Sequence, residues 1–124
     1  MPPNAFAGAQ LSIDLDAIAA NWRVLGARLR GGARAGAVVK ADAYGLGLAA
    51  VAPALYGAGC RDFFTASLDE AIALRAVLAN CRIYVFFGPL PDEAAEYSRH
   101  ALTPVLNDLD QIETWRAHIN RGGA

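Results

Sequence analysis

Lys40 and Tyr44 are the two residues whose types and spacing could perform covalent chemistry. Lys40 directly follows the apolar run 37–39, and Tyr44 stands four residues later. The glycines Gly45 and Gly47 come immediately after it. A lysine amine attacks an aldehyde only when it is unprotonated, and because an exposed lysine titrates near ~10.4, such a lysine needs burial or a neighbouring cation. The apolar run behind Lys40 could supply this burial, which makes Lys40 a candidate Schiff-base lysine.

The loop after Lys40 also has groups that suit an anionic ligand. The hydroxyl of Tyr44 could donate to a phosphate, and glycines let backbone amides approach an anion near the start of a helix. The alternative is structural: a surface lysine at the end of a strand, with Tyr44 packing beside it. The pattern alone leaves both interpretations open.

The stretch 45–50 reads G-x-G-x-x-A, which is also the pattern of a dinucleotide-binding turn. In that turn the first glycine follows the strand directly, whereas residues 40–44 intervene here. The acid expected at the end of the second strand is missing too, because Asp62 precedes the apolar pair Phe63 and Phe64. We therefore reject dinucleotide binding.

Strands and helices are predicted to alternate around these residues. The predicted strands are 10–15, 37–39, 63–66, 82–87 and 102–106. The predicted helices are 15–29, 48–58, 68–78, 91–97 and a last one after 107. This rhythm is typical of an α/β fold built of parallel βα units with right-handed crossovers. A doubly wound sheet fits this length, whereas a (β/α)8 barrel needs roughly 250 residues, so a complete doubly wound sheet and half of a barrel both remain possible.

Several helix starts have capping signals. Asp14 and Asp16 are both candidate N-caps for the first helix. Ser67 and Glu70 have the spacing of a capping box, in which each side chain binds the backbone amide of the other residue. Asn107, with Asp110 three residues later, is predicted to cap the last helix.

Composition limits the class of protein. The 124 residues are 55% hydrophobic and 19% charged, which predicts one soluble globular domain or a piece of one. The net charge of -1 and the scattered arginines argue against nucleic acid or an anionic membrane as a partner. Residues 1–10 lack the pattern of a secretory signal, and no apolar run has the length of a membrane span.

Cysteine and histidine spacing argues against a metal or redox site. Cys60 and Cys81 do not form a CxxC pair, so we expect two structural thiols in a reduced, cytoplasmic setting. His100 and His118 have no cysteine or carboxylate at ligand spacing, and we expect no metal.

The run 37–47, A-V-V-K-A-D-A-Y-G-L-G, closely resembles the pyridoxal-phosphate lysine motif of bacterial alanine racemases. Segments 13–18, 67–71 and 83–86 are similar to the family's opening segment, the exit of its second strand and its third strand. The resemblance implies that, after an N-terminal extension over 1–10, residues 11–124 form the N-terminal part of a truncated, TIM-type (β/α)8 barrel. About half of the barrel would be present.

The resemblance also implies an activity and a cofactor. The parent enzyme would interconvert L-alanine and D-alanine in the cytoplasm, with pyridoxal 5'-phosphate as cofactor, and would supply D-alanine for peptidoglycan. Lys40 would hold the cofactor through a Schiff base and act as the catalytic base on one face of the substrate. Tyr44 would bind the cofactor phosphate, and Phe86 would line the cofactor pocket.

Some parts of the family's site have no counterpart here. Leu46 stands where the family usually has histidine. The family's opposite-face base is a tyrosine of the partner subunit in a homodimer, and nothing in this chain corresponds to it. Most phosphate ligands and the arginine at the pyridine nitrogen would lie beyond residue 124.

A half-barrel leaves strand edges and an apolar face uncovered, so we expect association with a second copy or a complementary fragment. Two alternatives remain for function. The chain could be a non-catalytic, truncated cofactor-binding or assembly module, or its parent could be a related racemase or amino-acid decarboxylase of the same cofactor fold.

Overall fold

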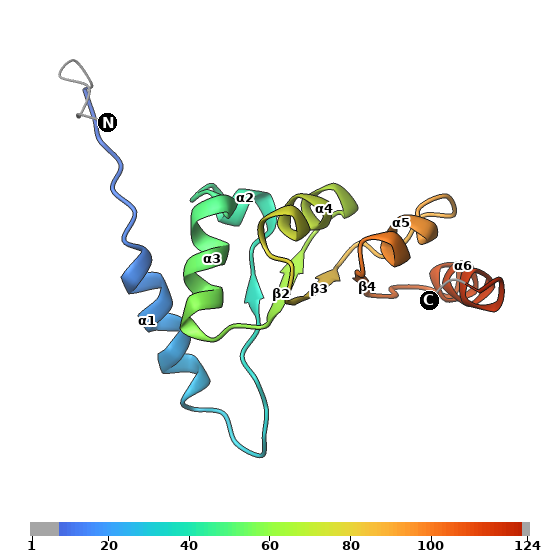
Figure 1. Cartoon of the computed structure of the whole chain (residues 1–124), viewed down its shortest axis with the longest axis horizontal. Coiled ribbons are helices and arrows are strands. Elements are labelled where there is room, and N and C mark those ends of the chain that lie inside the picture. The colour runs from blue at the N-terminus through green and yellow to red at the C-terminus, as the bar shows by residue number, and fades with distance from the viewer. Residues whose placement is uncertain (1–7, 123–124) are drawn as a thin grey trace.

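The computed structural model describes residues 8–122, which form an α/β arrangement (Figure 1). The helices of this part are α1 (Leu15–Gly26), α2 (Lys40–Tyr44), α3 (Leu48–Ala58), α4 (Leu68–Val77), α5 (Ala94–Arg99) and α6 (Leu109–Asn120). The strands are β1 (Ala37–Val38), β2 (Asp62–Thr65), β3 (Arg82–Val85) and β4 (Thr103–Pro104). Figure 1 shows the chain running from α1 at one end of the long axis to α6 at the other.

The four strands form one parallel sheet in the order β1-β2-β3-β4. Phe63 of β2 pairs with Ala37 of β1 on one side and with Ile83 of β3 on the other. Because the strand order never reverses within the described residues, this sheet lacks the switch point of a doubly wound fold. The predicted α/β class is confirmed, and the strand order favours part of a barrel over the doubly wound alternative.

The two faces of the sheet differ in burial. One face packs against helices, and its side chains are fully buried: Phe63, Thr65, Ile83 and Val85. On the other face the side chain of Val38 is 41% exposed, and a row of aromatic rings is only half-buried. In this row the ring of Phe64 stacks on Tyr84 at 4.7 Å and on Phe86 at 5.4 Å. We call Val38, Phe64, Tyr84 and Phe86 the open face.

Most predicted elements are confirmed within a few residues. The helix predicted over 48–58 has those bounds, and it accommodates Pro53. The capping box of α4 is present, with the Ser67 hydroxyl accepting from the Glu70 amide and the Glu70 carboxylate accepting from the Ser67 amide. The fourth strand is short and contains Pro104, which lacks the backbone donor that other residues have.

The strand predicted over 10–15 is wrong. Residues 9–14 have no regular structure, and α1 already begins at Leu15 because the Asp14 carboxylate caps it by accepting from the Ala17 amide at 2.9 Å. Leu11 is 78% exposed, so its alternation with polar neighbours does not mark a buried face. Of the predicted extension 1–10, residues 1–7 lie outside the described part.

The cap predicted for the last helix is wrong by one residue. Asp108, not Asn107, caps α6 by accepting from the Gln111 amide at 2.8 Å. The amide group of Asn107 donates instead to the backbone carbonyls of Phe86 and Val105. The competing contact across the sheet edge therefore overrides the local capping preference.

Candidate functional site

Lys40 lies at the carboxyl edge of the sheet, where β1 ends. Val39, just before it, is 2% exposed, and its amide donates to the carbonyl of Phe64 at 2.9 Å, so the backbone is held on β2 up to this point. Lys40 itself is half-buried, and its Nζ lies 5.9 Å from the centroid of the Tyr44 ring. None of the ion pairs found in residues 8–122 involves Lys40. The backbone before the amine is thus held on β2, and the amine is not paired with a carboxylate in this part of the chain.

The backbone after Lys40 forms a left-handed turn, α2. Residues 41–44 have φ angles between 52° and 57°, although none of them is glycine. A left-handed conformation costs about 1–2 kcal/mol for each such residue, so the turn stores roughly 4–8 kcal/mol that other contacts must offset. Strain of this kind concentrates at functional sites, where it fixes a geometry that an ordinary helix would not provide.

Glycines close this turn. Gly45 and Gly47 have φ angles of 81° and 97°, which favour glycine. The Gly45 amide donates to the Ala41 carbonyl at 2.8 Å, and the Gly47 amide donates to the Asp42 carbonyl at 2.9 Å. The two glycines predicted to form a turn are therefore required by the backbone geometry.

The side chain of Asp42, a residue of α2, lies at the start of α3. Its Oδ1 accepts from the amide of Leu48, the first residue of the helix, at 2.7 Å. The chain's own carboxylate thus takes one of the amides that an anion bound at this helix terminus would use. Sequence reasoning missed this contact because Asp42 stands six residues before the amide, outside the usual capping spacing.

Glu70 also reaches the turn. Its Oε1 accepts from the Ala41 amide at 2.8 Å, twenty-nine residues away in the chain. The capping-box spacing identified Glu70 as a residue at the start of a helix. No local pattern predicts its contact with the Ala41 amide, because that contact forms only when β1 and β2 pair side by side.

The structure brings two of the three predicted site residues together. Lys40 and Tyr44 share the α2 turn, and the Tyr44 side chain is 61% exposed. Phe86 follows β3 at the same edge of the sheet, but β2 separates it from them; its ring stacks on Phe64. Its half-buried ring belongs to the open face.

Lys40 is the only lysine of the chain. The sequence has eleven lysine and arginine residues, of which ten are arginine. Arginine is always protonated in proteins and cannot serve as an amine nucleophile. The one side chain able to form a Schiff base therefore stands at the carboxyl end of a parallel strand, where α/β enzymes place reactive groups.

The groups at this edge fit the expected cofactor. Lys40 offers an amine for the aldehyde, Tyr44 an exposed hydroxyl for the phosphate, and Phe86 an apolar ring for the pyridine. Space is available beside the turn, because a Cβ built on Gly45 or Gly47 meets no atom within 4 Å. The chemistry of the donors and the room beside them are both suitable for pyridoxal phosphate.

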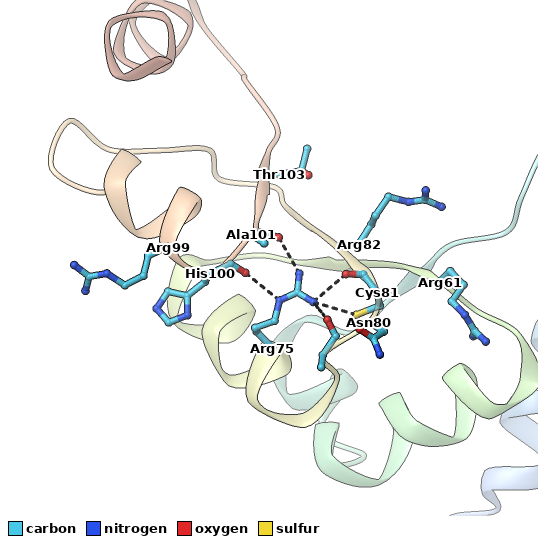
Figure 2. A pocket seen from close by; sticks show the side chains of 10 residues that line it. Arg61, Arg75, Asn80, Cys81, Arg82, Arg99, His100, Ala101 and Thr103 are labelled. Atoms are coloured by element: carbon cyan, nitrogen blue, oxygen red, sulfur yellow. Dashed lines mark hydrogen bonds between the residues drawn. The ribbon is translucent and has the colours of Figure 1, made fainter. Parts of the chain in front are cut away.

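Several arginines have structural contacts near the opposite, amino end of the sheet. A pocket of about 750 Å³ opens there (Figure 2), and it includes Arg75 among its walls. The Arg75 guanidinium donates to five backbone carbonyls, including those of Ala79, Cys81 and Ala101. The Arg75 side chain thus connects the end of α4 to the loop before β4. Its guanidinium lines the pocket, but its donors are already used in hydrogen bonds to the backbone.

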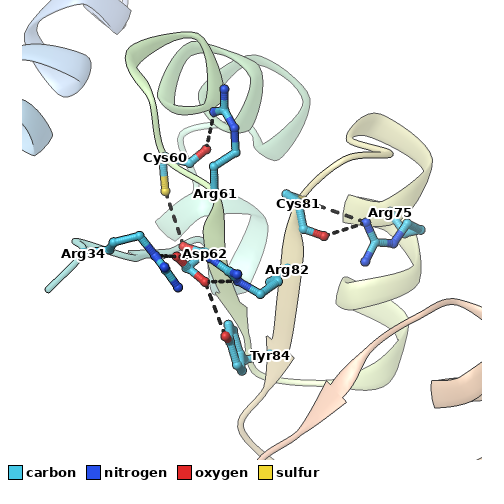
Figure 3. A network of polar contacts seen from close by, with 8 residues as sticks. All are labelled: Arg34, Cys60, Arg61, Asp62, Arg75, Cys81, Arg82 and Tyr84. Atoms are coloured by element: carbon cyan, nitrogen blue, oxygen red, sulfur yellow. Dashed lines mark hydrogen bonds and ion pairs between the residues drawn. The ribbon is translucent and has the colours of Figure 1, made fainter. Parts of the chain in front are cut away.

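Asp62 forms the main ion-pair network at this end (Figure 3). The buried carboxylate pairs with Arg82 and, at 3.1 Å, with Arg34, and it accepts from the Tyr84 hydroxyl at 3.3 Å. The hydrogen bond from Arg82 is the main cause that lowers the pKa of Asp62, against the effect of its burial. Groups at the amino end of such strands serve stability more than catalysis.

Within residues 8–122, no helix has the length and apolar content needed to cross a membrane.

Comparison with known proteins identifies the family. Residues 13–124 match the family described as alanine racemase, N-terminal domain. The alanine racemase of Methylobacterium nodulans is 53% identical over 108 residues, which cover 87% of this chain and 29% of that protein. This chain thus spans less than a third of that relative's length.

Solved structures have the same fold. Alanine racemase from Bartonella henselae, with covalently bound pyridoxal phosphate, superposes with a TM-score of 0.84 at 40% identity, covering 89% of this chain and 31% of that one. Histidine racemase from Leuconostoc mesenteroides superposes with a TM-score of 0.76 at 25% identity, over 88% of this chain and 29% of that one. The parallel sheet with its strained lysine turn, together with the family match, shows that this chain belongs to the alanine racemase N-terminal domain family.

Proposed function

We propose that this chain supplies the cofactor-lysine part of a pyridoxal-phosphate-dependent alanine racemase. The observation that carries the proposal is the placement of the chain's only lysine, Lys40, at the carboxyl end of β1. The family match and the covalently bound cofactor of the Bartonella henselae relative support it. Residues 11–124 would then form the N-terminal part of the (β/α)8 barrel.

Lys40 has two roles in this mechanism. Its Nζ would hold pyridoxal phosphate through the aldehyde carbon of the cofactor. When bound to the amino acid, the cofactor supplies an electron sink that makes the Cα proton acidic. The free Lys40 amine then holds that proton on one face of Cα, either removing or returning it.

Tyr44 and Phe86 orient the cofactor. The exposed Tyr44 hydroxyl would donate to a phosphate oxygen, and the Phe86 ring would shield the cofactor from water on one side. Racemisation also requires an acid or base on the opposite face of Cα, and a residue outside this chain would supply it. The assembled enzyme is accordingly proposed to be a homodimer.

The test is trapping of the cofactor on Lys40. The full chain is incubated with pyridoxal phosphate, reduced with borohydride and digested, and the label is located by mass spectrometry. We expect one labelled side chain, Lys40, together with a visible absorption band before reduction. The matched control is Lys40→Arg, which keeps the positive charge but cannot form the adduct, and it should lose both signals.

The single lysine makes the result unambiguous. Besides Lys40, the other primary amine of the 124 residues is the α-amino group of Met1. Label confined to that group, or a band of equal intensity in Lys40→Arg, would refute the proposal.

A broader amino-acid racemase is the second candidate. The observation in its favour is the likeness of this fold to histidine racemase from Leuconostoc mesenteroides. Loss of the Cα-deuterium from L-alanine and from L-histidine, measured side by side in the assembled enzyme, separates the two. The alanine reaction would provide D-alanine for peptidoglycan in the cytoplasm.

The open face is proposed to be an assembly surface. Its apolar side chains lie on the side of the sheet opposite the buried, helix-covered face. In a closed barrel this face points inward and is covered. A complementary segment of the enzyme, or a second copy of this chain, would cover it. If neither a complementary segment nor a second copy covered the open face, we would interpret the chain as a non-catalytic cofactor-binding module.

A further inference from the structure

The Glu70 carboxylate connects three elements at the carboxyl edge of the sheet. Its Oε1 accepts from the Ala41 amide at 2.8 Å. Its Oε2 accepts from the amides of Ala66, at 2.8 Å, and of Ser67, at 3.4 Å. One side chain at the start of α4 thus holds both the exit of β2 and the first peptide of the α2 turn.

The contact with Ala41 bears directly on Lys40. Ala41 is the first left-handed residue of the turn, with φ 52° and ψ 51°, and its amide belongs to the peptide that follows Lys40. Fixing that peptide fixes the direction of the Lys40 Cα–Cβ bond. Because left-handed alanine is unfavourable in isolation, the turn depends on contacts such as this one, in which the acceptor is charged and the hydrogen bond correspondingly strong.

We propose that Glu70 is a positioning residue for Lys40, in addition to its part in the capping box. Its two oxygens divide the tasks: Oε2 serves the local cap and Oε1 orients the lysine turn. The relevance of this role to cofactor binding rests on the proposed function, whereas the contact itself does not.

Glu70→Gln separates the two tasks. Glutamine keeps an oxygen at only one of the two positions that Oε1 and Oε2 occupy and places an NH2 donor at the other, so either the Ala41 amide or the amides of the cap face a donor instead of an acceptor. The two amides of the cap are three and four residues away in the chain, so we expect the oxygen to stay on the cap and the Ala41 amide to lose its acceptor. The labelling rate of Lys40 by limiting pyridoxal phosphate, trapped with borohydride, should fall about tenfold.

Ser67→Ala is the matched control. It removes the hydroxyl that accepts from the Glu70 amide at 3.4 Å, the other half of the capping box, and leaves the carboxylate contacts in place. It weakens the start of α4 without touching the lysine turn. Its labelling rate should stay within about twofold of the unaltered chain.

Amide hydrogen exchange provides a readout that does not depend on the cofactor. In the unaltered chain the Ala41 amide should be protected from exchange, although Ala41 is exposed, because Glu70 holds it. Protection of Ala41 should fall about tenfold or more in Glu70→Gln and remain in Ser67→Ala. If Glu70→Gln does not fold, the exchange rate of the Ala41 amide in the unaltered chain still tests the contact.

The outcomes are distinct. Rapid exchange of Ala41 in the unaltered chain, or equal labelling of Lys40 in Glu70→Gln and in the unaltered chain, would overturn the positioning role. An unaltered chain in which Lys40 is never labelled but Ala41 is protected would refute the proposed function and leave the Glu70 contact established.

Discussion

At the level of single residues, Lys40 is set apart by its chemistry and by its surroundings. The ten other strong cations of the chain are arginines, and Arg34, Arg75 and Arg82 are engaged with carbonyls or with Asp62. Lys40 follows a buried residue at the carboxyl edge and has no carboxylate partner within residues 8–122. Lys40 is therefore held in place by its backbone and not by an ion pair of its side chain.

Tyr44→Phe should weaken binding of pyridoxal phosphate without weakening the fold. The Tyr44 side chain is 61% exposed, so its hydroxyl contributes little to folding. A hydrogen bond to a charged phosphate is worth about 1.5–3 kcal/mol, so the dissociation constant should rise at least about tenfold. Titration of the visible band measures this change. Tyr56→Phe, on α3, is the control and should leave the affinity unchanged. Equal affinities of all three proteins would contradict the proposed role of Tyr44.

Asp62 should make the stability of the chain depend on pH. Its pKa is lowered in the fold by Arg82 and Arg34, so folding favours the ionised carboxylate. The resulting stabilisation is complete above the ordinary aspartate pKa of about 3.9 and is lost as the pH falls through the lower value of the folded state.

Asp62→Asn should therefore cost about 1–3 kcal/mol at pH 7 and much less near pH 2. Denaturant unfolding at the two pH values measures the difference. A penalty that is the same at both pH values would show that the ionised carboxylate is not what stabilises this end of the sheet.

At the level of elements, the α2 turn links the lysine strand to α3 by an unusual path. Four non-glycine residues in left-handed conformation are followed by Gly45. Glu70 accepts from the Ala41 amide at the start of the turn, and Asp42 accepts from the Leu48 amide at the start of α3. These two carboxylates supply charge-assisted hydrogen bonds that offset part of the backbone strain.

Asp42→Ala should destabilise the chain by about 1 kcal/mol, because the Leu48 amide at the start of α3 loses its acceptor. Asp42→Asn is the informative comparison, since its amide oxygen can still accept and should preserve most of the stability. Chemical denaturation measures both variants. If asparagine is as damaging as alanine, the negative charge at the helix start matters more than the hydrogen bond.

At the level of the whole molecule, helices cover only one face of the sheet. Phe63, Ile83 and Val85 are buried beneath helices, whereas Val38 and the aromatic rings of the open face remain partly accessible. The outer strands β1 and β4 each pair on one side alone within the described residues. Exposed apolar surface and unpaired strand edges both favour association.

The isolated 124-residue chain should therefore self-associate in a concentration-dependent way. Sedimentation velocity over a range of concentrations, with binding of a fluorescent apolar dye, measures this association. Addition of the segment that completes the barrel should replace self-association by a single complex and abolish dye binding. A monomer at all concentrations that binds no dye would contradict an open apolar face.

Much of the fold could be predicted because its signals are local. The apolar strand before Lys40, the capping box of Ser67 and Glu70, and the glycines after Tyr44 depend on neighbours in the chain. The prediction of a strand over 10–15 was wrong. The alternation of polar and apolar side chains suits a strand, but a strand also needs a neighbouring strand to bind its backbone, and these residues have none in the described structure.

The sequence by itself determined the strand that precedes Lys40, the alternation of strands and helices, and the likeness to alanine racemases. Each depends on residue types at short, fixed spacing. Only the tertiary structure decided that the strands follow one another without reversal and that Glu70 reaches across to Ala41. The left-handed turn also belongs here, because alanine has no local preference for that conformation and adopts it only when contacts from other elements offset the strain.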